Sequence, residues 1–277
     1  IRGNKFWLRP EDVDLPNELI KTGFKTVSRN GACRVSDLVI LISIDVSLNE
    51  HPKLFAILSD YRLTFVRDVL ESDDTLVWLD DAQEWFLLTS VKRNRLLAKI
   101  RQMLAIQADY TQDEFLDAID SSLAAYSGLY RSVPNDIVVS ITEKLFDCKV
   151  TEKSGVTYLH CDKLLQRSAV FPDEVAELIE YLEANPNIRE MELRKEFCEK
   201  RGIMTAPALA QRIHHSPFIT TTERGKVAVT GSEAAREARA RSLAAEKGER
   251  DSKTRQAATG KKTQKRKSST TSASSAR

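Results

Sequence analysis

The side chains best suited to contact a ligand gather between Thr205 and Ser216, in the last third of the chain. This segment has no acidic residue and contains four candidate DNA-contacting side chains: Gln211, Arg212, His214 and His215. Gln211 and Arg212 can form hydrogen bonds with the base edges of duplex DNA. Thr205 opens the segment and belongs to the same candidate site. Farther on, Arg224 and Lys226 flank a glycine turn, from which they could hold phosphates or reach a minor groove. For Arg212 and His215, contact with DNA and a merely solvated helix face are both open.

Two other basic groups extend this candidate DNA site. Arg93 and Arg95 flank Asn94 before a pair of leucines, where phosphate contact and the capping and solvation of a helix are both open. Near the C-terminus, five further cations are clustered: Lys261, Lys262, Lys265, Arg266 and Lys267. Such a cluster attracts nucleic acid of any sequence and is sensitive to salt, although in a eukaryote it could also serve as a nuclear address.

The chain lacks the residue patterns of common enzymes and metal sites. It has no glycine-rich phosphate loop, no GxSxG and no HExxH, and its four histidines do not adjoin plausible nucleophiles. His214, His215 and Cys198 have no fourth zinc ligand at a normal spacing. Trp78 and Trp85 are more typical of hairpin and core packing than of base stacking. We therefore expect a non-enzymatic protein with no cofactor and no metal.

The composition is that of a globular chain with a basic tail. The 277 residues are 42% hydrophobic and 30% charged, which leaves room for one to three domains. The net charge of +2 is unevenly divided, because 13 Lys and Arg face only 5 Asp and Glu from Gly231 to Arg277. From about Lys247 the tail is predicted to be disordered. The preceding stretch, 233–247, has Leu243 as its only large apolar residue, which predicts a frayed or solvated helix.

Membrane insertion and disulfide bonding are not indicated. The most apolar stretch, Asp37 to Val46, is far shorter than the roughly 20 residues that cross a bilayer, and no signal peptide is visible. The cysteines are far apart without a CxxC pair, which suggests neither a disulfide framework nor a zinc knuckle: Cys33, Cys148, Cys161 and Cys198. A reducing cytoplasm fits best. Because the chain runs from Ile1 straight into apolar residues, we expect 1–15 to be the end of a missing upstream segment.

The elements that must position these side chains recur three times along the chain. Each copy is predicted as three helices followed by a β-hairpin, in module 1 (16–91), module 2 (92–162) and module 3 (172–231). First helices begin near 16, 94 and 172, and hairpins end near 88, 159 and 229. A spacing of about 70 to 78 residues that occurs twice indicates a repeated fold.

Module 2 has the clearest periodicity. Its first helix is predicted to bury Leu96, Leu97, Ile100, Met103 and Leu104, with Arg95, Lys99 and Arg101 on the wet side. Thr111 and Glu114 have the spacing of a capping box before a second helix that buries Phe115, Leu116, Ile119 and Leu123. A third helix, 135–146, is expected to present Asp136, Ser140, Glu143 and Lys144 outward. A hairpin then pairs 149–151 with 156–159.

Modules 3 and 1 follow the same order. In module 3, Val175, Leu178, Ile179 and Leu182 form the first buried face, and Asn187 with Glu190 imitates a capping box. Gly202 is predicted to end a helix in the left-handed conformation, Thr205 caps the third helix, and 218–222 pairs with 226–229. In module 1 the first helix buries Ile20, Phe24 and Val27, and 76–79 pairs with 85–88. The run from Val35 to Ile44 suits a strand as well as a helix.

Three helices and a two-stranded hairpin in about 70 residues are typical of a winged helix, a variant of the helix-turn-helix. We therefore predict a mainly α (α+β) fold made of tandem winged-helix modules with a disordered basic tail. Modules 1 and 2 are acidic, with 7 basic against 12 acidic residues from Pro16 to Val91 and 7 against 9 from Asn94 to His160. Because duplex DNA is densely negative, module 3 is the better candidate for contact with it.

Several stretches also resemble known DNA-binding families. Trp85-Phe86, Arg93-Asn94-Arg95-Leu96-Leu97, Ile100-Arg101 and Met103-Leu104 are similar to bacterial sigma-factor-like helix-turn-helix proteins, which carry aromatic residues before an Arg-Asn-Arg-Leu-Leu helix. Module 3 resembles the HARE-type winged helix, which is also found in the delta subunit of bacterial RNA polymerase. The two resemblances cover about Phe55 to Thr230 and imply DNA binding or contact with the transcription apparatus.

The hypothesis from these observations is a non-enzymatic, transcription-associated protein whose module 3 and tail contact double-stranded DNA. It would be cytoplasmic and associated with the nucleoid, and its oligomeric state is left open. One alternative is a winged-helix array that binds RNA polymerase or another transcription protein, with the tail alone meeting nucleic acid. A second is the accessory C-terminal part of a nucleic-acid enzyme whose catalytic domain lies upstream.

Overall fold

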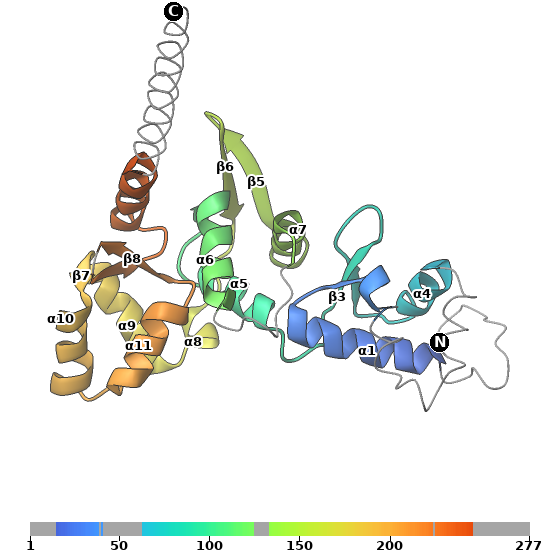
Figure 1. Cartoon of the computed structure of the whole chain (residues 1–277), viewed down its shortest axis with the longest axis horizontal. Coiled ribbons are helices and arrows are strands. Elements are labelled where there is room, and N and C mark those ends of the chain that lie inside the picture. The colour runs from blue at the N-terminus through green and yellow to red at the C-terminus, as the bar shows by residue number, and fades with distance from the viewer. Residues whose placement is uncertain (1–14, 39, 41–62, 125–132, 224, 246–277) are drawn as a thin grey trace, which may run out of the picture.

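The computed structural model describes residues 15–38, 40, 63–124, 133–223 and 225–245. They form a mixed α/β chain with three small antiparallel sheets. Figure 1 shows the three modules following one another along the long axis of the molecule, with α1 and α4 toward one end and α10 at the other. In the described part of the chain, no helix is both long enough and apolar enough to cross a membrane.

Module 1 follows the predicted order as far as it is described. Its elements are α1 (Leu15–Asn30), β1 (Cys33–Arg34), α4 (Leu63–Leu70), β2 (Leu76–Trp78) and β3 (Trp85–Leu88). The predicted hairpin is confirmed, with Val77 opposite Leu87. The run that suited both strand and helix is helical over 35–38, and 39 and 41–44 lie outside the described residues. The predicted upstream segment also falls outside them, apart from Leu15.

Module 2 confirms most of the predicted pattern. It consists of α5 (Arg95–Leu104), β4 (Asp109–Thr111), α6 (Gln112–Ala124), α7 (Asn135–Phe146), β5 (Cys148–Lys153) and β6 (Val156–Cys161). All five residues predicted for the inner face of α5 are buried, as are the four predicted for α6. The Thr111 hydroxyl accepts a hydrogen bond from the Glu114 backbone N at 3.2 Å, which is the first half of the predicted capping box.

Module 3 has the same order with one irregular helix. It contains α8 (Arg167–Val170), α9 (Asp173–Ala184), β7 (Ile188–Arg189), α10 (Glu190–Arg194), the π-helical turn η2 (Lys195–Lys200), α11 (Ala206–His215), β8 (Ile219–Glu223) and β9 (Lys226–Val229). Gly202 has φ +64°, as predicted for a helix end. The second predicted capping box was wrong, because the side-chain oxygen Oδ1 of Asn187 accepts a hydrogen bond from the Thr222 hydroxyl instead of capping the helix.

Each sheet contains a short strand that the sequence did not reveal. The strands β1, β4 and β7 have only two or three residues, and each pairs antiparallel with the second strand of its own hairpin. The resulting orders are β1-β3-β2, β4-β6-β5 and β7-β9-β8. The same strand order in all three sheets strengthens the repeat that the periodicity predicted.

The buried residues form two cores, and the first is shared by modules 1 and 2. It extends from Leu19 in α1 to Cys161 in β6, while the second combines module 3 with Ala105 and Ile106 at the end of α5. The join between the first two modules is close. At Gly31 (φ +94°) a Cβ would lie 2.4 Å from Leu96 Cβ, so this position requires glycine both for its backbone and for its space.

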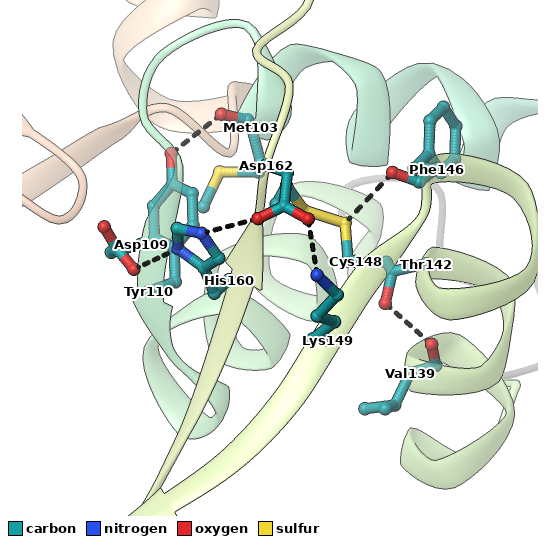
Figure 2. Close-up of a disulfide and its surroundings, with 11 residues drawn as sticks. Met103, Asp109, Tyr110, Val139, Thr142, Phe146, Cys148, Lys149, His160 and Asp162 are labelled. Atoms are coloured by element: carbon teal, nitrogen blue, oxygen red, sulfur yellow. Dashed lines mark hydrogen bonds and ion pairs between the residues drawn. A yellow bond between two sulfur atoms is a disulfide. The ribbon is translucent and has the colours of Figure 1, made fainter.

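Cys148 and Cys161 form a disulfide at the base of the β5–β6 hairpin, which contradicts the expectation of unpaired cysteines. The strand register explains the bond, because these residues lie directly opposite each other although 13 positions separate them. Figure 2 shows a polar cluster beside it, in which Asp162 contacts both Lys149 and His160. Asp109 and then Asp162 raise the pKa of His160. Cysteine usage therefore does not argue for a reducing compartment.

A helix that follows module 3, at 233–245, is docked on α6. The prediction that it has no face to dock was wrong, because Ala235 and Ala238 are buried despite their small size. Arg236 lies 3.4 Å from Glu114, whose side chain is only 7% exposed, and Arg239 pairs with Asp117. Small residues and charge pairs thus replace the large apolar stripe on which the prediction relied.

Candidate nucleic-acid interface

The helix α11 presents most of the predicted DNA-contacting side chains. Its N-cap Thr205 accepts a hydrogen bond from the Ala208 backbone N at 3.4 Å, so Thr205 has a structural role as a cap. Leu209 and Ile213 hold the helix on the core of module 3. The opposite side exposes three of the predicted residues, and the helix has no acidic residue: Gln211, His214 and His215. One carboxylate borders this face, because Glu190 of α10 lies 4.0 Å from His214. Gln211 and His215 are the exposed residues of the face that can approach a negatively charged ligand.

Arg212 has a different environment from its neighbours. It is half-buried and lies near Lys99 of α5, whose Nζ donates a hydrogen bond of 2.8 Å to the backbone carbonyl of His215. Of the three residues predicted to face solvent on α5, Arg95 and Arg101 are exposed, but Lys99 is half-buried because it contacts module 3. Burial, and then repulsion by Arg212, lowers the pKa of Lys99 to about 8.

The side chains of Arg93 and Arg95 are exposed at the start of α5. Between them Asn94 is buried and caps the helix, accepting from the Leu97 backbone N at 3.0 Å. Its amide also donates to the Gly31 carbonyl at 2.7 Å. The order of these residues is thus explained by capping, and the two arginines are left accessible. Like α11, α5 has no acidic residue, and the Lys99–His215 bond joins the two helices.

The hairpin of module 3 is less basic than predicted. Lys226 lies 3.0 Å from Glu223, which also pairs with Arg241 of the C-terminal helix at 2.9 Å. Lys226, and to a lesser degree Arg241, lowers the pKa of Glu223, so this carboxylate stays charged near neutral pH. The positive charge of Lys226 is therefore balanced by the carboxylate of Glu223. Arg224 and the five cations of the tail lie outside the described residues.

The third helices of modules 1 and 2 are engaged elsewhere. In α7, the Ser140 hydroxyl donates to the Leu79 carbonyl, and Lys144 Nζ donates to the Trp78 carbonyl at 2.8 Å. Both acceptors belong to the hairpin segment of module 1, so this hairpin covers part of the side of α7 that was predicted to face outward. In α4, Arg67 binds Glu84 of its own hairpin at 3.2 Å.

Comparisons with known proteins add no relative, because no family model, curated protein or solved structure matches the chain. Among the described residues, no group of three or more His, Cys, Asp or Glu side chains is arranged to hold a metal ion. Any functional assignment therefore depends on the arrangement of α5, α11 and their neighbours.

Proposed function

We propose that the chain is a non-enzymatic DNA-binding protein that acts in transcription, built from three winged-helix modules with α11 as the helix that enters a major groove. The single observation that carries this proposal is the exposed side of α11, a helix with no acidic residue of its own, which presents Gln211, His214 and His215. Amide and imidazole groups on such a helix can hydrogen-bond to base edges. In a bacterium, this activity implies a cytoplasmic location on the nucleoid.

The repeated topology supports the winged-helix part of the proposal. In each module a first helix leads to a short strand, and two further helical segments lead to a hairpin whose second strand pairs with the short one. For module 1 this applies to the described residues, where 35–38 is helical and α4 precedes the hairpin. In helix-turn-helix proteins of this kind, the helix before the hairpin is the one that reaches into the major groove.

Module 3 is favoured over the other two because its third helix combines access with a suitable charge. In α7, contacts with module 1 occupy Ser140 and Lys144, while α4 carries Asp68 on its exposed side. Carboxylates near the phosphates of DNA are repelled. The basic tail would add a salt-dependent attraction that does not depend on sequence.

The test is binding of a fluorescein-labelled DNA duplex to the full chain, followed by anisotropy. Gln211→Glu places an acid on the proposed groove face while keeping the shape of the side chain. We expect it to weaken binding about tenfold at about 150 mM salt, since a new carboxylate would face the duplex. Asn17→Asp makes the same amide-to-acid change on the exposed side of α1 and should leave binding unchanged.

Two results would remove the proposal. The first is a wild-type protein that does not retain duplex even at about 50 mM salt, where electrostatic binding is strong. The second is equal affinity for wild type and Gln211→Glu, which would show that the duplex does not contact the exposed face of α11. In that case any binding would come from the tail or from other surfaces.

A further inference from the structure

The junction between modules 2 and 3 contains two cations without a counter-ion. Lys99 reaches from α5 to the last carbonyl of α11, and Arg212 lies one turn earlier on α11, close enough to disfavour the charge on Lys99. Among the described residues, neither side chain forms an ion pair with a carboxylate. His215, which supplies the carbonyl, is the other titratable residue of α11 at this contact.

This arrangement differs from that of the arginines that form ion pairs elsewhere in the described part of the chain. Arg167 pairs with Glu183, Arg201 with Glu196, and Arg236 with Glu114. Burying like charges together is unfavourable unless something neutralises them. On the same side of α5, one turn from Lys99, the amide oxygen of Gln102 is also buried without a hydrogen-bond partner in the described structure. The polar groups of this junction are therefore incompletely satisfied.

The Lys99 ammonium lies at the last turn of α11, the turn that Arg212 begins, and an ammonium and a guanidinium on one helical turn are suited to a phosphate. The guanidinium can donate two parallel hydrogen bonds to phosphate oxygens, and the ammonium adds a compact positive charge. Such an anion would relieve the repulsion between Lys99 and Arg212. Because Gln211 and His215 on the same helix face solvent, a duplex docked on α11 would bring its backbone close to this junction.

We propose that Lys99 and Arg212 together hold one backbone phosphate of the duplex that α11 contacts, so that modules 2 and 3 bind DNA jointly. The inference rests on the proposed function and deepens it. It assigns a DNA contact to Lys99 on α5, and it changes the expected role of Arg212 from base recognition to phosphate binding. It also makes the relative placement of the two modules part of the DNA site.

The experiment compares duplex affinity over a range of salt for Lys99→Met, Arg212→Met and the double variant in the full chain. Methionine keeps an unbranched side chain and removes the charge. We expect Lys99→Met to bind duplex about fivefold more weakly than wild type. If the two residues hold the same phosphate, the double variant should reduce the slope of log affinity against log salt by about 0.9, the value for one phosphate contact.

Lys200→Met is the matched control, because Lys200 is an exposed lysine of module 3 that is paired with Glu196. It should leave both affinity and slope unchanged. Melting temperature provides the second readout. Removing the charge of Lys99 also removes its repulsion by Arg212, so we expect Lys99→Met to melt no lower than wild type. A residue with only a structural role would lose stability without changing the salt slope.

The outcomes separate this inference from the proposed function. If wild type binds duplex and Gln211→Glu weakens it, but Lys99→Met binds like wild type, the shared phosphate site is wrong and the function stands. A slope that falls by about twice 0.9 in the double variant would indicate two separate phosphates and would also overturn the shared site. If wild type does not bind duplex, both proposals fail together.

Discussion

The environment of Lys99 in the folded chain differs from the one that the sequence predicts. On α5 considered alone, it belongs to the polar side of an amphipathic helix. In the folded chain, Lys99 contacts α11 through the His215 carbonyl, and burial and then the charge of Arg212 lower its pKa. Helical periodicity identifies the polar side of a helix, but it cannot tell whether that side faces water or another module.

The stability of the protein should depend on pH through Lys99. The pKa of Lys99 is lowered from 10.5 to about 8 in the folded chain, so the folded state binds fewer protons than the unfolded state between these values. The free energy of unfolding contributed by this group therefore rises from about pH 8 to about pH 10.5, and the destabilisation is fully present below pH 8. Arg212 and His215 of α11 are the residues that face Lys99.

Lys99→Met lacks this titration, so its free energy of unfolding should rise less than that of wild type over the same window. Urea denaturation at about pH 7, 8, 9 and 10 measures the difference. Lys200→Met should follow wild type, since Lys200 is exposed. If the free energy of unfolding changed with pH equally for wild type and Lys99→Met, the pH dependence would not come from Lys99.

At the scale of elements, α5 depends on a side chain that also belongs to the join with α1. Asn94 caps α5 through its amide oxygen and binds the Gly31 carbonyl through its amide nitrogen. A second bond, from the Ser28 hydroxyl to the Arg93 carbonyl at 2.7 Å, runs between the same two segments. The start of α5 is therefore held both as a helix end and as a contact between modules.

Asn94→Ala should lower the free energy of unfolding by about 2–3 kcal/mol, because it removes a helix cap and leaves the buried Gly31 carbonyl without its partner. Chemical denaturation measures this loss. Asn94→Ser keeps an oxygen for the Leu97 backbone N but loses the donor to Gly31, so its stability should be intermediate. Full stability of Asn94→Ala would show that the cap and the contact with Gly31 contribute little.

The helices and hairpins were largely predictable, because long amphipathic segments carry a strong periodic signal. The buried faces of α5, α6 and α9 agree with the predicted residues. The strands β1, β4 and β7 were not predicted, because two or three residues are too few to show the alternation of apolar and polar residues that marks a strand. The disulfide was missed for a related reason, because Cys148 and Cys161 become neighbours only through the strand register.

The candidate site was predictable in part. The sequence located α11 and its exposed side chains, because the absence of acids is visible without a fold. It could not reveal that Lys99 reaches the last turn of α11, or that Glu223 pairs with Lys226, since both depend on contacts between separate elements. The docking of α7 on the hairpin of module 1 is likewise a contact between modules that no local pattern encodes.

At the scale of the whole molecule, the C-terminal helix connects module 3 back to module 2. Arg236 and Arg239 bind Glu114 and Asp117 of α6, while Arg241 binds Glu223 of β8. The helix therefore contacts both modules whose junction holds Lys99 and Arg212. Its arginines have carboxylate partners, and this leaves the basic tail beyond 245 as a separate source of positive charge.

Arg236→Met should destabilise the docked helix by about 1–2 kcal/mol, because Glu114 would remain buried without its partner. Hydrogen exchange of 233–245 should become faster, and the melting temperature should fall slightly. Arg241→Met breaks an exposed pair and should cost about 0.5 kcal/mol or less. Equal effects of the two substitutions would show that the burial of Glu114 is unimportant.

The contact between the first hairpin and α7 bears on how the chain can be dissected. Removing everything before Lys92 would strip Trp78 and Leu79 from Ser140 and Lys144, and would also uncover Leu96 where Gly31 now covers it. The shortened protein would expose residues of α7 and α5 that module 1 covers in the intact chain. DNA binding measured on such a truncation could therefore come from this newly exposed surface. Point substitutions in the intact chain avoid that artefact.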